Sequence, residues 1–253
     1  MNIKTLNFLF GVSALLLYSC SPNVYSTSGQ NVPMFKAKGE VSANVNFIYS
    51  DKVDKIVGAQ AQGAYAISDK LAASFNVTAL KQLKVPDSFW SGQGFYHEIA
   101  GGTYGTLAKK LITYEVFGGL GSGYMRSQNP ERPFEVLNTN IFKPYIQPSI
   151  GISSTYLELA ITPRVAYVRY KMSGYNVIAG SETISPLNSV GSLVFEPGVT
   201  LRTGFKGTKF QIQYNYSTFE PPKWVNGLMK RNTFSFGLYL LLSSRGDYYS
   251  RPY

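Results

Sequence analysis

Residues 210–217 read Phe-Gln-Ile-Gln-Tyr-Asn-Tyr-Ser, so that apolar or aromatic side chains alternate with neutral polar ones. Successive side chains of an extended strand point to opposite faces, and this segment therefore has one apolar and one polar face. A strand on the surface of a soluble sheet would usually cover its outer face with Lys and Glu. The neutral polar face instead suits an enclosed position, and the apolar face suits contact with lipid.

The same alternation recurs along most of the chain, in runs near the roughly 9–11 residues that a tilted transmembrane strand requires. It predicts ten strands, at about Val41–Phe47, Val57–Ile67, Leu71–Thr78, Gln93–Tyr104, Leu111–Met125, Phe142–Ser153, Leu157–Tyr167, Leu193–Arg202, Phe210–Ser217 and Phe234–Leu242. Alternation alone also permits a soluble lipocalin-like barrel, whose apolar face would point inward. The neutral polar faces, with occasional Glu and Arg of opposite sign, favour a membrane barrel with a polar interior.

The connections between the predicted strands alternate in length. The short ones are Ser68–Lys70, Gly105–Lys110, Ser154–Thr155 and Lys206–Lys209, and the long ones are Lys81–Gly92, Arg126–Ile141, Lys171–Ser189 and Thr218–Arg231. The first connection, around Ser50–Lys55, departs from this rule. Bacterial outer-membrane barrels have short periplasmic turns and long extracellular loops. We therefore predict an all-β fold, a single antiparallel up-and-down transmembrane barrel of about ten strands over residues 39–243.

The N-terminus resembles a bacterial lipoprotein signal. Lys4 precedes an apolar run, Leu6–Leu17, that is too short to span a bilayer and is typical of a secretory signal. The run ends in Leu17-Tyr18-Ser19-Cys20, which resembles a lipobox, and Cys20 is the only cysteine. The resemblance implies a signal peptide over 1–19 and diacylglycerol and acyl chains on Cys20. An ordinary secretory signal with an incidental cysteine is the alternative.

The segments that flank the barrel lack alternation. Residues 20–38 contain Pro22, Gly29 and Pro33, and we interpret them as a lipid-anchored periplasmic linker. Residues 244–253 form the predicted C-terminal tail. Because the strand number is even, we expect both the N- and the C-terminus on the periplasmic side, with the lipid on Cys20 in the inner leaflet of the outer membrane.

Four charged residues form the most distinctive polar group, a predicted barrel-interior charge cluster. Two neighbouring strands each carry a Glu and an Arg six residues apart on the polar face: Glu158 with Arg164, and Glu196 with Arg202. Such a group can be a charged constriction that selects ions. It can also be a plug of paired charges, which we favour because side chains largely fill a barrel of eight to ten strands.

The only histidine, His97, is the candidate for barrel-enzyme chemistry. Omptin-like proteases and lipid-modifying barrel enzymes pair a His with carboxylates or a Ser at the outer rim. Glu98 is adjacent in sequence but on the opposite face, so we interpret His97 as a rim residue at the lipid headgroups. No catalytic residue is predicted, and one His with one Cys cannot supply a metal site.

The formal net charge is +10, and the cations concentrate in loops and turns. Outside the cell, such residues can pair with the phosphates of lipopolysaccharide, although ordinary solvated loops explain them equally well. No nucleic-acid-binding module is present in the sequence.

Several stretches together resemble uncharacterised Bacteroidota outer-membrane β-barrel lipoproteins. They are Asn31–Phe35, Lys38–Glu40, Gln62–Asp69, Tyr145–Gly151 and Phe195–Arg202. The resemblance implies an outer-membrane location and no particular chemistry. We predict a non-enzymatic barrel with a structural, binding or accessory-subunit role in a larger outer-membrane complex. A narrow solute channel is the alternative, and an omptin-like or lipid-modifying enzyme is less favoured. The expected partners are outer-membrane lipid, lipopolysaccharide and other outer-membrane proteins; no cofactor is expected besides the acyl chains on Cys20.

Overall fold

The computed structural model describes residues 25–50, 55–83, 91–133, 135–175, 177–179, 182–184, 189–205, 207–219, 229–230 and 232–242. The predicted signal peptide 1–19, Cys20 and the predicted tail 244–253 lie outside the described residues.

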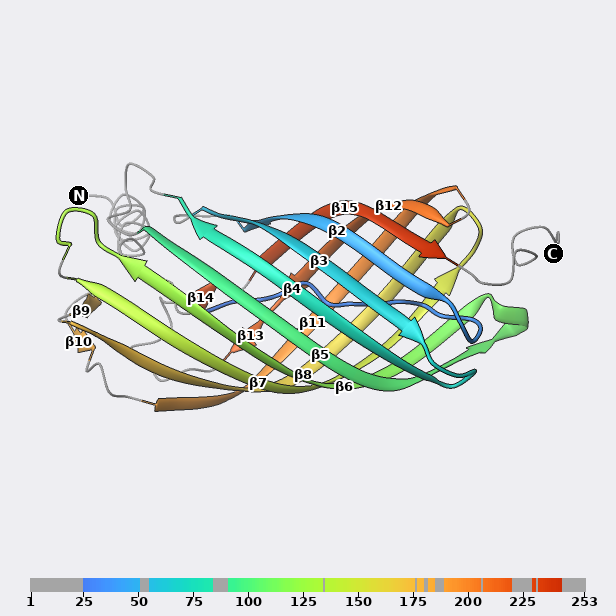
Figure 1. The fold of residues 1–253 in the computed structure, drawn as a ribbon, viewed down its shortest axis with the longest axis horizontal. Helices are drawn as coiled ribbons and strands as arrows, with labels where there is room; N and C mark the ends of the chain where they lie inside the picture. Colours follow the sequence, from blue (N-terminus) through green and yellow to red (C-terminus); the bar gives the residue numbers. More distant parts are fainter. Residues whose placement is uncertain are drawn as a thin grey trace, which may run out of the picture.

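Ten long antiparallel strands form a closed barrel, as predicted (Figure 1). They are β2 (Val41–Ser50), β3 (Ile56–Ala66), β4 (Leu71–Gln82), β5 (Ser91–Leu107), β6 (Ile112–Gln128), β7 (Val136–Ser153), β8 (Leu157–Tyr175), β11 (Ser189–Phe205), β12 (Thr208–Tyr216) and β15 (Asn232–Leu242). Each pairs with the next along the chain, and β15 pairs with β2. Closure leaves no free edge along the ring, which a structure exposed to lipid requires.

Short strands lie at one end of this barrel. β1 (Tyr25–Ser26) pairs in parallel with β14 (Met229–Lys230), β9 (Val177–Ala179) pairs with β10 (Glu182–Ile184), and β13 (Thr218–Phe219) pairs with β11. At the other end, η2 (Ala108–Lys110) is a single 3-10 turn between β5 and β6. Among the described residues, no helix is long and apolar enough to cross a membrane.

The barrel has a short-turn end and a long-loop end. The short-turn end carries the connections 67–70, 108–111, 154–156 and 206–207. The long-loop end carries 51–55, 83–90, 129–135, 176–188 and 217–231. The predicted long loop Arg126–Ile141 is wrong over most of its length, because β6 continues to Gln128 and β7 begins at Val136.

The outer wall is apolar and the inner wall is polar over most of the barrel. Exposed fractions reach 68% for Leu193, 65% for Val45 and 63% for Ile99, whereas Gln211 and Asn215 are 0% exposed. The prediction that the apolar face of 210–217 points outward is therefore confirmed. This inside-out distribution is that of a barrel whose exterior contacts lipid.

The polar interior lies between two apolar layers. At the long-loop end, inward-facing side chains that include Ile48, Met125 and Tyr170 form one buried cluster. At the short-turn end, Phe35, Tyr104 and Phe117 belong to a second cluster, together with buried alanines. The first layer explains the error at β6 and β7, because Leu137 and Ile141 face inward there and reverse the expected polarity of the alternation.

Candidate functional site

The barrel lumen is occupied by residues 26–35, which we call the lumenal segment. All ten residues are buried, and the segment runs between the strands from the long-loop end to the short-turn end (Figure 1). It begins where β1 pairs with β14, and it ends near Gly39, whose N–H donates to the Ala66 carbonyl just before β2. The prediction of a periplasmic linker over 20–38 is therefore wrong for residues 26–35.

This path places the first and the last described residues of the chain at opposite ends of the barrel. Tyr25 lies at the long-loop end, whereas β15 runs toward Leu242 at the short-turn end. The even strand number does place the start of β2 and the end of β15 together, as expected. The strand number does not determine the path of the segment before β2, and that segment passes back through the barrel.

The lumenal segment contains no charged residue and has no strand partner from Thr27 to Lys36. Its buried backbone groups therefore need partners from side chains of the wall. The carbonyl of Gly29 accepts hydrogen bonds from Gln60 (3.2 Å), Gln62 (3.2 Å) and Asn76 (3.0 Å). A side chain at position 29 would collide with the side-chain amides of Gln60 and Gln213, which leave no room for a Cβ there.

Wall residues bind the backbone at most of the following positions. Gln213 Oε1 accepts the N–H of Gln30 at 2.9 Å, and Gln213 Nε2 donates to the Gln30 carbonyl at 2.8 Å. Other contacts to segment carbonyls are Gln147 Nε2 to Asn31 (2.7 Å), Arg202 Nη2 to Val32 (2.6 Å) and Tyr239 Oη to Pro33 (2.6 Å). The inward-facing Gln, Asn and Tyr side chains thus replace the sheet partners that this segment lacks.

The second half of the segment is apolar and closes the short-turn end. Val32 and Met34 pack with Ala160, and the Phe35 ring meets the Tyr104 ring edge-on, with centroids 5.7 Å apart. Beyond it, the Lys36 N–H donates to Glu40 Oε2 at 2.7 Å. Burial raises the pKa of the Glu40 carboxyl above its usual range, although the N–H groups of Lys36 and Ala37 oppose this shift.

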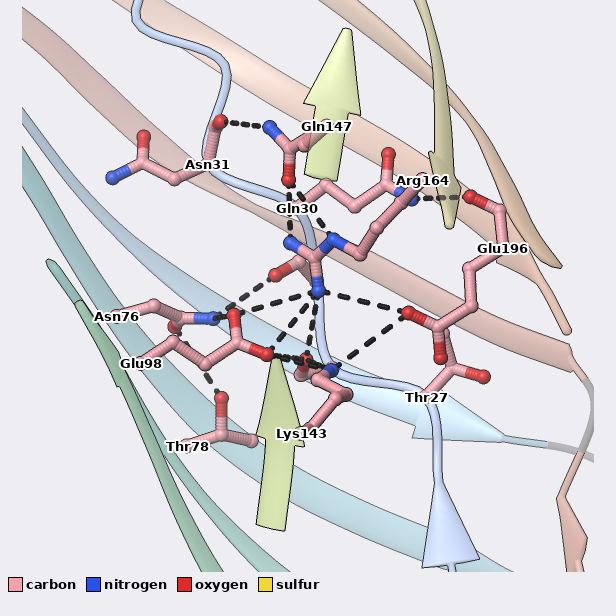
Figure 2. Close-up of polar contacts among 12 residues, drawn as sticks. Thr27, Gln30, Asn31, Asn76, Thr78, Glu98, Lys143, Gln147, Arg164 and Glu196 are labelled. Carbon is pink, nitrogen blue, oxygen red and sulfur yellow. Dashed lines mark hydrogen bonds and ion pairs between the residues drawn. The ribbon is translucent and has the colours of Figure 1, made fainter. Parts of the chain in front are cut away.

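A central ionic cluster, Glu98, Lys143, Arg164 and Glu196, surrounds the first half of the segment (Figure 2). Lys143 Nζ lies 2.6 Å from Glu98 Oε1, and Arg164 Nη1 lies 3.2 Å from the same oxygen. Glu196 Oε2 lies 3.7 Å from both cationic nitrogens. Ser28 of the segment joins the cluster, since its Oγ donates to Glu98 Oε1 at 2.8 Å.

A second ionic cluster, Glu158, Arg202 and Lys209, lies nearer the short-turn end. Glu158 receives Arg202 Nη1 at 3.1 Å and Lys209 Nζ at 2.6 Å, one on each carboxylate oxygen. The Arg202 guanidinium also lies over the Tyr239 ring, 3.7 Å from its centroid. Both clusters are almost fully buried, so each charge is stabilised by its partners in the cluster and not by water.

The structure places all four residues of the predicted cluster in the lumen but divides them between these two groups. Glu196 lies opposite Arg164, and Arg202 lies opposite Glu158, in the register of β11 with β8. Sequence reasoning missed Lys143 and Lys209 as partners. Their positions were readable from alternation, since Lys143 shares a face with Gln147, and Lys209 shares one with Gln211.

His97 lies on the outer wall, away from the ionic clusters. Its side chain is exposed, and its ring centroid is 6.2 Å from that of Phe95, while neighbouring Glu98 points into the lumen. Among the described residues, no group of three or more His, Cys, Asp or Glu side chains could hold a metal ion. Among the described residues of the lumen, the charged side chains of the two ionic clusters pair with one another.

The chain matches no protein-family model and no curated protein. Its structure is similar to the outer membrane protease OmpT from Escherichia coli, with 10% identity over 81% of this chain and 94% of that chain and a TM-score of 0.41. It is also similar to the translocator domain of the autotransporter NalP from Neisseria meningitidis (10% identity, 81% and 88% covered, TM-score 0.45). A third similar structure is that of the attachment invasion locus protein Ail of Yersinia pestis, with 9% identity over 82% of this chain and 100% of that chain and a TM-score of 0.35. At these values the likeness concerns the barrel alone, and no activity carries over.

Proposed function

We propose that this chain is a non-enzymatic outer-membrane β-barrel lipoprotein, anchored through Cys20, with a structural or accessory-subunit role in a larger outer-membrane complex. The observation that carries the proposal is the filled lumen. The lumenal segment, two ionic clusters and two apolar layers occupy the described interior, and the cations there are paired. A protein built in this way acts through its outer surfaces and loops.

The accessory role is tested by purification from native membranes in a mild detergent. We expect the protein to migrate as part of a complex with at least one other outer-membrane protein, in a defined ratio that survives a second chromatographic step. A solitary monomer under conditions that preserve known outer-membrane complexes would count against this role.

The absence of a solute path is tested by electrical recording. In planar bilayers, the purified barrel is expected to give no steady ionic conductance, because a route through the lumen would have to displace the lumenal segment and separate buried ion pairs. A porin reconstituted in the same way provides the positive control. Steady openings that change when Arg164 or Arg202 is replaced by Gln would favour the channel alternative instead.

A further inference from the structure

The direction of the lumenal segment is fixed by a series of contacts along the barrel. Near the long-loop end, the Thr27 carbonyl accepts from Thr233 Oγ1 at the beginning of β15. Further along, the Val32 carbonyl meets Arg202 and the Pro33 carbonyl meets Tyr239, both in the half nearer the short turns. Each step along the sequence is thus a step toward the short-turn end. Tyr25 therefore leaves the lumen among the long loops.

The two ends of a bacterial barrel differ in which side of the membrane they face. Short turns lie in the periplasm and long loops lie outside the cell. Several strands also exceed the roughly 9–11 residues needed to span the membrane, with 17 residues in β6, 18 in β7 and 19 in β8. The connections 129–135 and 176–188 lie at the long-loop end. By this rule, Tyr25 is on the outer side.

We infer that the lipid on Cys20 is inserted in the outer leaflet at the cell surface, and not in the inner leaflet as an ordinary periplasmic anchor would be. The inference rests on the proposed outer-membrane lipoprotein. Cys20 precedes Tyr25 by five residues, and five extended residues span at most about 18 Å. The hydrocarbon core is about 30 Å thick. The chain before Tyr25 is therefore too short to return across the membrane.

The lumenal segment is held too firmly to be withdrawn toward the periplasm. It is buried over ten residues, and its carbonyls bind side chains from β3, β4, β7, β11, β12 and β15. Removing it would break the hydrogen bonds that these amides and Arg202 donate to the segment, and it would leave buried polar groups of the wall with fewer partners. The anchor therefore stays on the side where β1 lies.

The test uses single-cysteine variants in intact cells and a maleimide that does not cross membranes. Acylation consumes the thiol of Cys20, the only native cysteine, so an introduced cysteine is the only free thiol. Asn23→Cys reports on the chain next to the anchor, Glu131→Cys reports on the long-loop end, and Lys70→Cys reports on the short-turn end. Residues 131 and 70 are exposed. Retention of heat-dependent mobility on SDS gels confirms that each variant is folded.

Asn23→Cys and Glu131→Cys are expected to be labelled in intact cells, and Lys70→Cys only after permeabilisation. If Asn23→Cys, like Lys70→Cys, is labelled only after permeabilisation, the inference is overturned while the membrane placement stays intact. Equal labelling of Glu131→Cys and Lys70→Cys would instead overturn the placement of the barrel itself, and the inference with it. Metabolic labelling with palmitate, compared with Cys20→Ser, tests the lipid separately, and its absence in the parent protein would refute the anchor.

Discussion

Replacing residues 26–35 by a Gly-Ser chain of equal length is expected to lower the free energy of unfolding by at least about 5 kcal/mol. Met34 and Phe35 are 2% and 0% exposed, and truncation of a buried Met or Phe costs about 2–5 and 3–5 kcal/mol respectively. The replacement also removes the amides of Gln30 and Asn31. The measurement is the temperature at which the purified barrel loses its compact, fast-migrating form on SDS gels.

The matched control inserts the same ten Gly-Ser residues between Pro130 and Glu131, in an exposed connection at the long-loop end. Exposed loop tips tolerate insertions, so this variant is expected to unfold close to the temperature of the parent protein. If the two variants unfold together, the lumenal segment does not support the barrel.

Glu98→Leu is expected to be the most damaging single substitution, with a loss of about 3–5 kcal/mol in the free energy of unfolding. Glu98 receives Lys143 at 2.6 Å, Arg164 at 3.2 Å and the Ser28 hydroxyl at 2.8 Å. Without it, two buried cations share Glu196, which is 3.7 Å from each. Thermal unfolding followed by circular dichroism in detergent measures the effect.

A second variant distinguishes lost charge pairing from a packing error. Glu98→Leu combined with Lys143→Met removes one carboxylate and one cation, and it is expected to recover part of the stability lost in Glu98→Leu. The exposed Glu131→Leu serves as the control for loss of a carboxylate and should change the stability little. An unfolding temperature for Glu98→Leu equal to that of Glu131→Leu would contradict the role of the central ionic cluster.

Alternation along the chain was sufficient to predict the barrel, its number of strands and the direction of most side chains. The period of two is a local property, and neutral polar residues such as Gln211, Gln213 and Asn215 identify an enclosed face without any tertiary information. The short and long connections followed in the same way, because turn residues interrupt the alternation. The layer of inward apolar side chains near Leu137 disturbed this reasoning.

The lumenal segment could not be predicted in this way, because nothing in Ser26–Phe35 repeats with a regular period. Its conformation is determined by partners such as Gln60, Gln147 and Gln213, which are distant in sequence. One signal was available. The inward faces carry more side-chain amides than the predicted ion pairs could satisfy, and this excess indicates that a further polar segment lies inside the barrel.

The seam between β15 and β2 has a consequence for biogenesis. If Cys20 carries the proposed lipid, that end of the chain cannot be drawn through an interior that is already packed, and the other end of the lumenal segment leads into β2. The segment must therefore be in place before β15 pairs with β2 and closes the barrel. In the proposed topology, any machinery that inserts this protein has to deliver the acylated end across the bilayer first, and the strands must then close around the lumenal segment.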